Sequence, residues 1–367
     1  MNRRDFLRYG LALGATFAID TKESHAAFTW LRKGVLPPGM VVVDAHAHPD
    51  QFYYPYPQDS EPDLSSSLEK ITVLGMRGSN FAASGDSQNG VTPWPNVLSQ
   101  IGYVNKLETS GQVKIIRSCS DVHQYLYKKG PVPAAILSLE GARPIGIVGA
   151  YPDIANGLEE LFENGVRMIT VMHRGDNQFG TNMSYEGTDG PELGLTDLGK
   201  QLVEKIIDKG MIVDGAHASY ATLIDMANIA KASGVPIIDS HTSLSPRSVP
   251  NGSRLRSWKE MEVIAETGGL ICTWPLQWES PELRVRRWNI RDWARENYEI
   301  KKRFGARHVA LGTDGGGQLP AMVEGYASIL DLPKLVAAMH RAGFKEWEID
   351  LYMGGNFRRV LETCLSA

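Results

Sequence analysis

Cysteine is scarce in this chain of 367 residues, and positive charge is not in excess. The three cysteines, Cys119, Cys272 and Cys364, are far apart and form no Cys-x-x-Cys pair, which argues against a disulfide framework and a thiolate zinc site. Lysine and arginine number 38 against 42 acidic residues, so the net charge of -4 argues against a nucleic-acid partner. The chain also has no internal repeat and no low-complexity tract. These absences leave an ordinary globular protein.

The first residues have the pattern of an export signal. The pair Arg3-Arg4 precedes a short apolar run from Tyr9 to Ile19, and Ser24-His25-Ala26 is a small-x-small cleavage site. This pattern resembles a bacterial twin-arginine signal peptide. We therefore expect the twin-arginine export machinery to recognise residues 1–26, and residues 27–367 to form a periplasmic or secreted protein. The apolar run is too short to be a stable membrane span.

Short apolar runs alternate with helical patterns along the rest of the chain. We expect strands at 41–44, 71–76, 113–116, 134–140, 166–172, 211–216, 235–240, 269–274 and 309–313. We expect helices at 94–107, 154–163, 198–209, 221–232, 332–341 and 346–361. Roughly eight strand–helix units predict one α/β domain folded as a (β/α)8 TIM barrel. A doubly wound open sheet is the alternative, but no Gly-x-Gly-x-x-Gly follows the first strand.

Residues of the types that commonly bind metals lie at the ends of six of these strands. In chain order they are His46 with His48, Glu140, His173, His217, His241 and Asp314. In a parallel barrel the carboxyl ends of all strands lie on one rim, where barrel enzymes carry their catalytic residues. A single histidine there is more often a packed or solvated side chain, but a whole set of His, Glu and Asp is hard to obtain by chance. The sequence therefore predicts a metal site on this rim.

The number of donors points to two ions. His46 and His48 are two residues apart, so an extended backbone places both imidazoles on one face. One ion takes only three or four of these groups. Glu140 is suited to bridge two ions roughly 3.5–4 Å apart around a shared hydroxide, which is the chemistry of metal-assisted hydrolysis. Three carboxylates just inside the strand ends are candidates for orienting the imidazoles, namely Asp44, Asp214 and Asp239.

Several short motifs occur in an order typical of a known family. They include Asp44-Ala45-His46, Ser138-Leu139-Glu140-Gly141, Asp214-Gly215-Ala216-His217, Asp239-Ser240-His241-Thr242, Leu311-Gly312-Thr313-Asp314 and Gly354-Gly355-Asn356-Phe357. Over residues 41–362 the chain resembles the membrane (renal) dipeptidase family of zinc peptidases, within the amidohydrolase-like metal-dependent hydrolases. The resemblance implies a zinc-dependent enzyme that hydrolyses dipeptides or related short amides with an activated water held between two Zn²⁺ ions. It also suggests a homodimer, by analogy alone.

The resemblance implies a role for each residue of the rim. His46, Glu140 and Asp314 would hold one zinc ion, and Glu140 would bridge to a second ion held by His217 and His241. Asp314 would also accept the proton of the attacking water.

Substrate contacts follow from the same resemblance. His173 would stabilise the oxyanion of the tetrahedral intermediate, with Asn177 as a further substrate contact. Arg254 would pair with the free carboxylate of the dipeptide, a role that suits a bidentate guanidinium. Arg247 and Arg256 are the alternatives for this role.

Two positions depart from the family pattern. The family's first strand ends in His-x-Asp, whereas this chain has His46-Ala47-His48. We interpret His48 as a substituted ligand, which removes one negative charge from the first site. The alternative register, His48-Pro49-Asp50, restores His-x-Asp but loses the match at Asp44. At Ala142-Arg143 we expect smaller or more neutral side chains, so this pair is expected to alter the pocket.

Two other functions are alternatives to the dipeptidase hypothesis. His-x-His is the usual opening of the wider amidohydrolase superfamily, so one alternative is hydrolysis of a non-peptide amide, lactam or lactone. The other is a barrel that binds a ligand but no longer hydrolyses it. His48 favours the second alternative, and the presence of every other ligand position argues against it.

Overall fold

The computed structural model describes residues 34–51, 63–87, 90–128, 130–146, 152–183, 193–245, 254–280 and 285–366. The expected signal peptide, residues 1–26, lies outside these residues, as does the expected start of the mature chain at residue 27. Among the described residues, no helix is both long and apolar enough to cross a bilayer.

Eight parallel strands form the barrel. In spatial order they are β1 (Val43–Asp44), β2 (Gly78–Ser84), β6 (Ala134–Glu140), β7 (Val166–Thr170), β8 (Ile212–Asp214), β9 (Ile238–Thr242), β10 (Leu270–Thr273) and β13 (Val309–Leu311). Backbone hydrogen bonds link the last strand to the first: Ala45 N donates to Leu311 O (3.0 Å) and Asp314 N to His46 O (2.9 Å). The expected (β/α)8 barrel is therefore confirmed.

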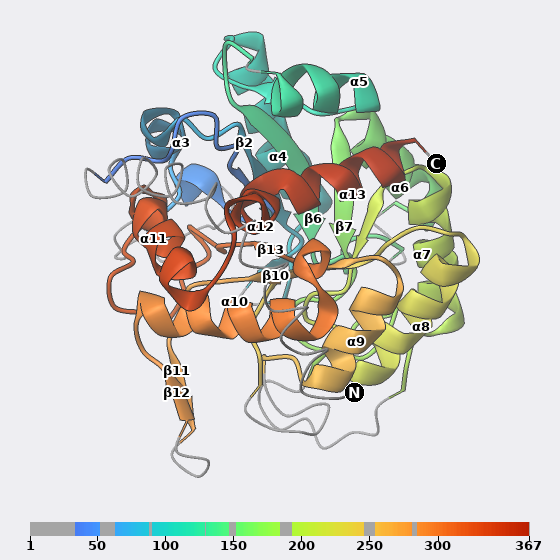
Figure 1. The fold of residues 1–367 in the computed structure, drawn as a ribbon. Helices are drawn as coiled ribbons and strands as arrows, with labels where there is room; N and C mark the ends of the chain where they lie inside the picture. Colours follow the sequence, from blue (N-terminus) through green and yellow to red (C-terminus); the bar gives the residue numbers. More distant parts are fainter. Residues whose placement is uncertain are drawn as a thin grey trace.

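Helices surround the strands (Figure 1). They are α3 (Leu68–Leu74), α4 (Trp94–Thr109), α5 (Cys119–Asp121), α6 (Ile154–Glu163), α7 (Asp197–Asp208), α8 (Tyr220–Ala232), α9 (Trp258–Glu266), α10 (Ile290–Phe304), α11 (Leu332–Ala342), α12 (Glu346–Asp350) and α13 (Asn356–Leu365). In many of these helices an N-cap side chain accepts a hydrogen bond from a backbone N–H of the first turn. The expected N-cap Thr196, for example, accepts a hydrogen bond from Gly199 N at the start of α7 (3.0 Å).

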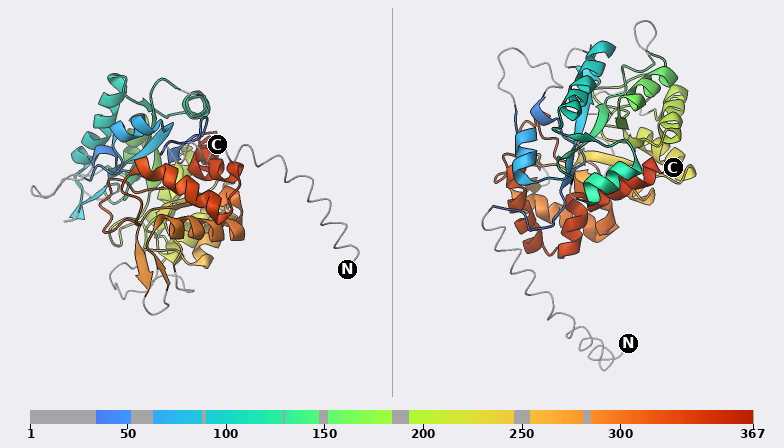
Figure 2. Two further views of the ribbon diagram at one scale, coloured as in Figure 1. Left: turned by 60° about the vertical axis from the view of Figure 1, so that its left-hand side comes forward. Right: turned by 90° about the horizontal axis from the view of Figure 1, so that it is seen from above.

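Short elements complete the chain. The 3-10 and π segments are η1 (Pro49–Gln51), η2 (Val122–Tyr127), η3 (Ala306–His308), η4 (Ile329–Asp331) and η5 (Leu351–Gly355). The minor strands are β3 (Asp86–Ser87), β4 (Gly90–Val91), β5 (Lys114–Ile115), β11 (Trp278–Ser280) and β12 (Val285–Arg287). Strands β11 and β12 pair antiparallel as a hairpin that projects from the barrel (Figures 1 and 2).

Two apolar layers arise because side chains alternate along each strand. On β6, Ala134 and Ile136 belong to a cluster with Val43, Met168 and Ile212 of other strands. Ala135, Leu137 and Leu139 belong to a second cluster, which includes residues of most of the surrounding helices. The first cluster fills the barrel interior, and Phe357 and Val360 of α13 join it. Residues 138 and 140 continue the inward alternation, so Glu140 faces into the barrel at the carboxyl end of its strand.

The prediction of one strand is wrong. Residues 71–76, expected as a strand, lie largely in the helix α3, because Ser67 caps its first turn and Gly75 ends it with a left-handed φ of 73°. The neighbouring barrel strand is β2, whose sequence Gly78-Ser79-Asn80-Phe81-Ala82-Ala83-Ser84 has no β-branched residue. It is buried on both sides, between β1 and β6. The helices α9 and α10 and the β11–β12 hairpin were also not among the expected elements.

Candidate metal centre

The Glu140 carboxylate lies at the middle of the carboxyl-terminal rim. Five imidazole Nε2 atoms surround its two oxygens: His48 and His217 at 3.3 Å, His46 and His241 at 3.4 Å, and His173 at 3.7 Å. Burial raises the pKa of Glu140, but His173, His46 and His217 outweigh it and hold this pKa well below its ordinary value. The structure thus brings all five expected histidines together around one carboxylate.

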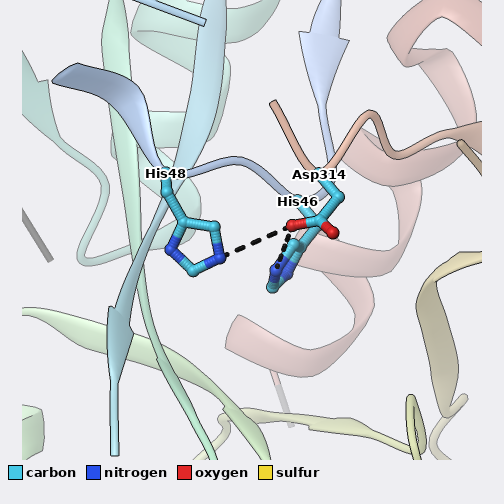
Figure 3. Close-up of side chains that lie close together, drawn as sticks. All are labelled: His46, His48 and Asp314. Carbon is cyan, nitrogen blue, oxygen red and sulfur yellow. Dashed lines mark ion pairs between the residues drawn. The ribbon is translucent and has the colours of Figure 1, made fainter. Parts of the chain in front are cut away.

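His46, His48 and Asp314 converge from the two strands that close the barrel. Both imidazoles point toward the Asp314 carboxylate (Figure 3), with Nε2–Oδ1 distances of 3.8 Å for His46 and 3.6 Å for His48. Both side chains are fully buried. They face the same carboxylate, as expected for side chains on one face of an extended segment. His48 Nδ1 also lies 2.8 Å from Ala82 O of β2. His48 therefore belongs, with His46 and Asp314, to a group that could hold a metal ion. Asp50 lies in η1, and its carboxylate accepts from Leu68 N (3.1 Å).

His217 and His241 approach from the neighbouring strands β8 and β9. Their Nε2 atoms are 3.1 Å apart. His217 and Asp314 both have a left-handed backbone, with φ of 63° and 50°. Such conformations are unfavourable for residues other than glycine and gather at functional sites.

The loop after Asp314 depends on glycine. A Cβ atom on Gly317 would lie 2.0 Å from Asp314 Oδ1, and one on Gly316 would lie 2.1 Å from His48 O. Gly316 also has a left-handed φ of 86°. The run Gly315-Gly316-Gly317 therefore lets the chain pass close to two of the expected ligands.

The donor set fits metal ions. Three groups have ligand atoms within 4.8 Å of one another: His46, His48 and Asp314; His46, Glu140 and His241; and Glu140, His173 and His217. His46 Nε2 is buried and makes no hydrogen bond within the described part of the chain. Imidazole and carboxylate are the ligands that zinc takes in catalytic sites. Burial lowers the pKa of His46, but Glu140 and Asp314 outweigh it and raise this pKa to about 9, so the pocket strongly favours a cation.

Of the three buried aspartates expected to orient imidazoles, only Asp214 connects to them. Its Oδ2 accepts from Ser240 Oγ (2.7 Å), which in turn contacts the Nδ1 atoms of His46 and His241. Asp44 instead accepts from Thr313 N and His46 N, and Asp239 binds Arg256. Asp44 and Asp239 therefore hold the backbone and an arginine, which contradicts that part of the expectation.

A cavity of ≈ 540 Å³ opens above the centre. Glu140, His173, His217, His241 and Asp314 form its floor, and its walls include Arg174, Asp176, Met183, Arg254, Trp274, Leu276 and Leu319. Arg254 is 6% exposed, lies 4.7 Å above the Trp274 ring and donates to His241 O (3.1 Å). Its Nη1 has no hydrogen-bond partner in the described chain. A buried guanidinium with a spare donor is suited to bind a substrate carboxylate.

The two alternative arginines are placed differently. Arg256 is fully buried and bonded to Asp239 (2.6 Å) and Glu260 (3.1 Å), so it cannot serve a substrate. Arg247 lies outside the described residues.

His173 lies between Glu140 and a second acidic group. Its Nδ1 is 3.8 Å from the buried Asp86 carboxylate. Burial lowers the pKa of His173 to about 4 despite the opposing effect of Glu140, so the ring is neutral at neutral pH. Asp86 is paired with Arg143 (3.2 Å), whose Nη2 donates to Arg174 O and Asp176 O. The unusual Arg143 thus holds the loop that forms one wall of the cavity.

Asn177 is not among the residues that line the cavity. Its side-chain amide donates to Val171 O (3.0 Å) and accepts from Phe179 N (2.8 Å). The described structure therefore places it inside the loop after β7, away from the expected substrate contact.

Sequence reasoning missed Trp274, Asp86 and Ser240. Trp274 follows β10, and the end of this strand has no His, Glu or Asp. The sequence therefore did not indicate that β10 contributes to the site. Asp86 lies just past β2, the strand that was not recognised. Ser240 precedes His241 on β9, and only the folded structure brings it next to His46.

Comparison with known proteins identifies the family. A family model described as membrane dipeptidase (peptidase family M19) matches residues 75–366. The match begins after His46 and His48, the segment in which this chain departs from the family pattern.

Two curated relatives are named as dipeptidases. The chain is 26% identical over 260 residues to dipeptidase tcpJ of Claviceps purpurea, covering 69% of this chain and 55% of that protein. It is 26% identical over 272 residues to dipeptidase verJ of Clonostachys rogersoniana, covering 72% of this chain and 64% of that protein. The chain thus spans less than two thirds of either relative.

Solved structures share the fold. A metallo peptidase called dipeptidase AC has a TM-score of 0.72 at 20% identity, with 89% of this chain and 99% of that chain covered. A metallo peptidase from Rhodobacter sphaeroides, liganded with a phosphinate mimic of the dipeptide L-Ala-D-Ala, has a TM-score of 0.71 at 20% identity, with 88% and 99% covered.

Proposed function

Because this chain belongs to the membrane dipeptidase family, we propose that it is a metal-dependent dipeptidase that hydrolyses dipeptides or closely related short amides. The observation that carries the proposal is the convergence of five imidazoles and Asp314 around Glu140, which lies at the floor of a cavity that also holds Arg254. A hydrolytic centre and a carboxylate-binding group in one cavity match a small substrate with a free carboxyl end.

Two Zn²⁺ ions are the proposed cofactors. His46, His48, Asp314 and Glu140 would hold one ion, and Glu140, His217 and His241 would hold the other. When bound, ions of this kind lower the pKa of a bound water and polarise a carbonyl oxygen. With His48 in place of a carboxylate, the first site carries one negative charge fewer than the family pattern.

The remaining roles belong to groups of this chain. Burial raises the pKa of Asp314 to about 6 although His46 and His48 oppose it, so this carboxylate is largely ionised at neutral pH and can accept a proton from water. Neutral His173, on the floor of the cavity, can donate a hydrogen bond to a developing oxyanion. Arg254, stacked on Trp274, would bind the substrate's carboxylate.

The cellular setting is part of the proposal. The twin-arginine pattern in residues 1–26 supports export and a periplasmic or secreted enzyme. A homodimer is the proposed assembly by analogy with relatives.

The test is a metal and substrate screen on the purified mature protein. We expect two zinc ions per chain, turnover of dipeptides including those with a D-residue at the carboxyl end, and loss of activity on chelation that zinc restores. Glu140→Gln removes the central negative charge and should abolish turnover. Absence of turnover for every dipeptide, in protein that holds its metal, would refute the proposal.

A second candidate function is favoured by His46-Ala47-His48. This His-x-His opening is typical of amidohydrolases that act on non-peptide amides, lactams or lactones. The same screen separates the two functions if it includes such compounds without a free carboxylate.

A further inference from the structure

The hydroxyl of Ser240 lies between two imidazoles that we assign to different metal ions. Its Oγ is 2.9 Å from His241 Nδ1 and 3.3 Å from His46 Nδ1. The two rings are stacked, with centroids 3.9 Å apart and planes at 22°, so both Nδ1 atoms face the same oxygen. Ser240 is fully buried.

The direction of these hydrogen bonds follows from the Asp214 carboxylate. An ionised carboxylate only accepts, and Asp214 accepts from Thr170 Oγ1 (2.6 Å), from Ala216 N and Ser240 N (both 3.0 Å) and from Ser240 Oγ (2.7 Å). The single Ser240 proton is thus directed to Asp214. The two lone pairs of the hydroxyl oxygen then accept from the two imidazoles, so both Nδ1 atoms carry hydrogen.

This arrangement leaves the Nε2 lone pairs of both rings for the centre. His46 Nε2 and His241 Nε2 are each 3.4 Å from Glu140 Oε1. A histidine ligand usually has its own partner on the other ring nitrogen, which fixes its tautomer and orientation. His48 follows that rule, because its Nδ1 lies against Ala82 O. His46 and His241 instead share one hydroxyl.

We propose that Ser240 is a positioning residue that orients His46 and His241 together and thereby couples the two metal sites. The inference rests on the proposed two-ion centre. It predicts that removing this single hydroxyl weakens the binding of both ions, although no atom of Ser240 is a proposed ligand.

The test compares Zn²⁺ binding by Ser240→Ala with binding by the wild-type chain. Competition with a chromophoric chelator measures both dissociation constants. We expect each of them to rise roughly 10- to 100-fold, the usual effect of removing a group that orients a ligand. The visible spectrum of the Co²⁺-loaded protein should also change, since it reports ligand geometry. Neither measurement depends on turnover.

A matched control is available three residues along the chain. Ser243 is also fully buried, and its Oγ makes no hydrogen bond among the described residues, so Ser243→Ala should bind Zn²⁺ as the wild type does. Ser240→Thr keeps the hydroxyl and should retain most of the affinity. If Ser240→Ala does not fold, Ser240→Cys replaces it, because a thiol of similar size is a weak acceptor.

Unchanged Zn²⁺ affinity in Ser240→Ala or Ser240→Cys would overturn the inference, as would weakening of one site alone. These outcomes differ from failure of the proposed function, in which the wild-type protein binds zinc but hydrolyses no dipeptide.

Discussion

Arg254 and Arg256 lie two residues apart, both buried, in opposite electrostatic surroundings. Arg256 donates to Asp239, Glu260, Ala218 O and Gly215 O. Burial lowers its pKa, but the two carboxylates outweigh burial and the pKa is raised above its ordinary value. Arg254 has no carboxylate within ion-pair distance in the described chain, and burial lowers its pKa. It lies between Trp274, His217 and the cavity.

This difference indicates a structural role for Arg256 and a binding role for Arg254. A buried charge costs several kcal/mol unless partners compensate for it. Arg256 has these partners within the fold, so its role is to join β9, the loop after β8 and the start of α9. Arg254 Nη1 has no hydrogen-bond partner in the described chain, so its N–H groups are available to the substrate carboxylate proposed above.

The largest expected effect is on stability, from Arg256→Met. The substitution leaves Asp239 and Glu260 buried without their cation, which should lower the free energy of unfolding by about 3–5 kcal/mol. Urea denaturation of the metal-free protein measures the change. Arg254→Met is the matched control and should alter stability much less, since it strands no carboxylate. Equal losses in the two variants would contradict the comparison.

The next effect is on catalysis, from Arg254→Gln. Loss of a charged hydrogen bond to the substrate is worth about 1.5–3 kcal/mol, so kcat/KM for dipeptides should fall roughly 10- to 150-fold. Most of the change should be in KM, because the interaction exists before the reaction begins.

A carboxyl-amidated dipeptide sharpens this measurement. The wild-type enzyme should prefer the free acid to the amide, and Arg254→Gln should lose that preference. If the variant kept the full preference, another group would bind the carboxylate, and Arg247 would be the first to test.

The same pair of arginines shows what the sequence could predict. The resemblance favoured Arg254 over Arg256, but the sequence could not show why the two differ, because the difference depends on contacts with Asp239 and Glu260. The structure has Arg254 on the wall of the cavity and Arg256 enclosed. Contacts between distant residues carry this information, and a linear pattern does not.

The strands show the same limit. β6 could be recognised because its residues form one apolar run that ends in Glu140. β2 could not, because Gly78, Ser79 and Asn80 have low strand propensity and become buried only through pairing with β1 and β6. The histidines and carboxylates of the rim were predictable because strand ends in a parallel barrel must meet. Asp86 was lost together with β2.

The smallest expected effect concerns what supports Arg254. The Trp274 ring, 4.7 Å from the guanidinium, takes the place that carboxylates have around Arg256. Trp274→Leu keeps an apolar side chain but removes the cation–π contact, worth about 1–2 kcal/mol for this largely buried pair, so KM should rise roughly 5- to 30-fold. Trp274 also lies edge-on to His241, so zinc content must be measured in parallel. A rise in KM with unchanged zinc content means that an aromatic face can hold a buried arginine in place while leaving its charge available to the substrate. An unchanged KM would assign that task to the hydrogen-bond contacts of Arg254 with His241 O and His217 Nε2.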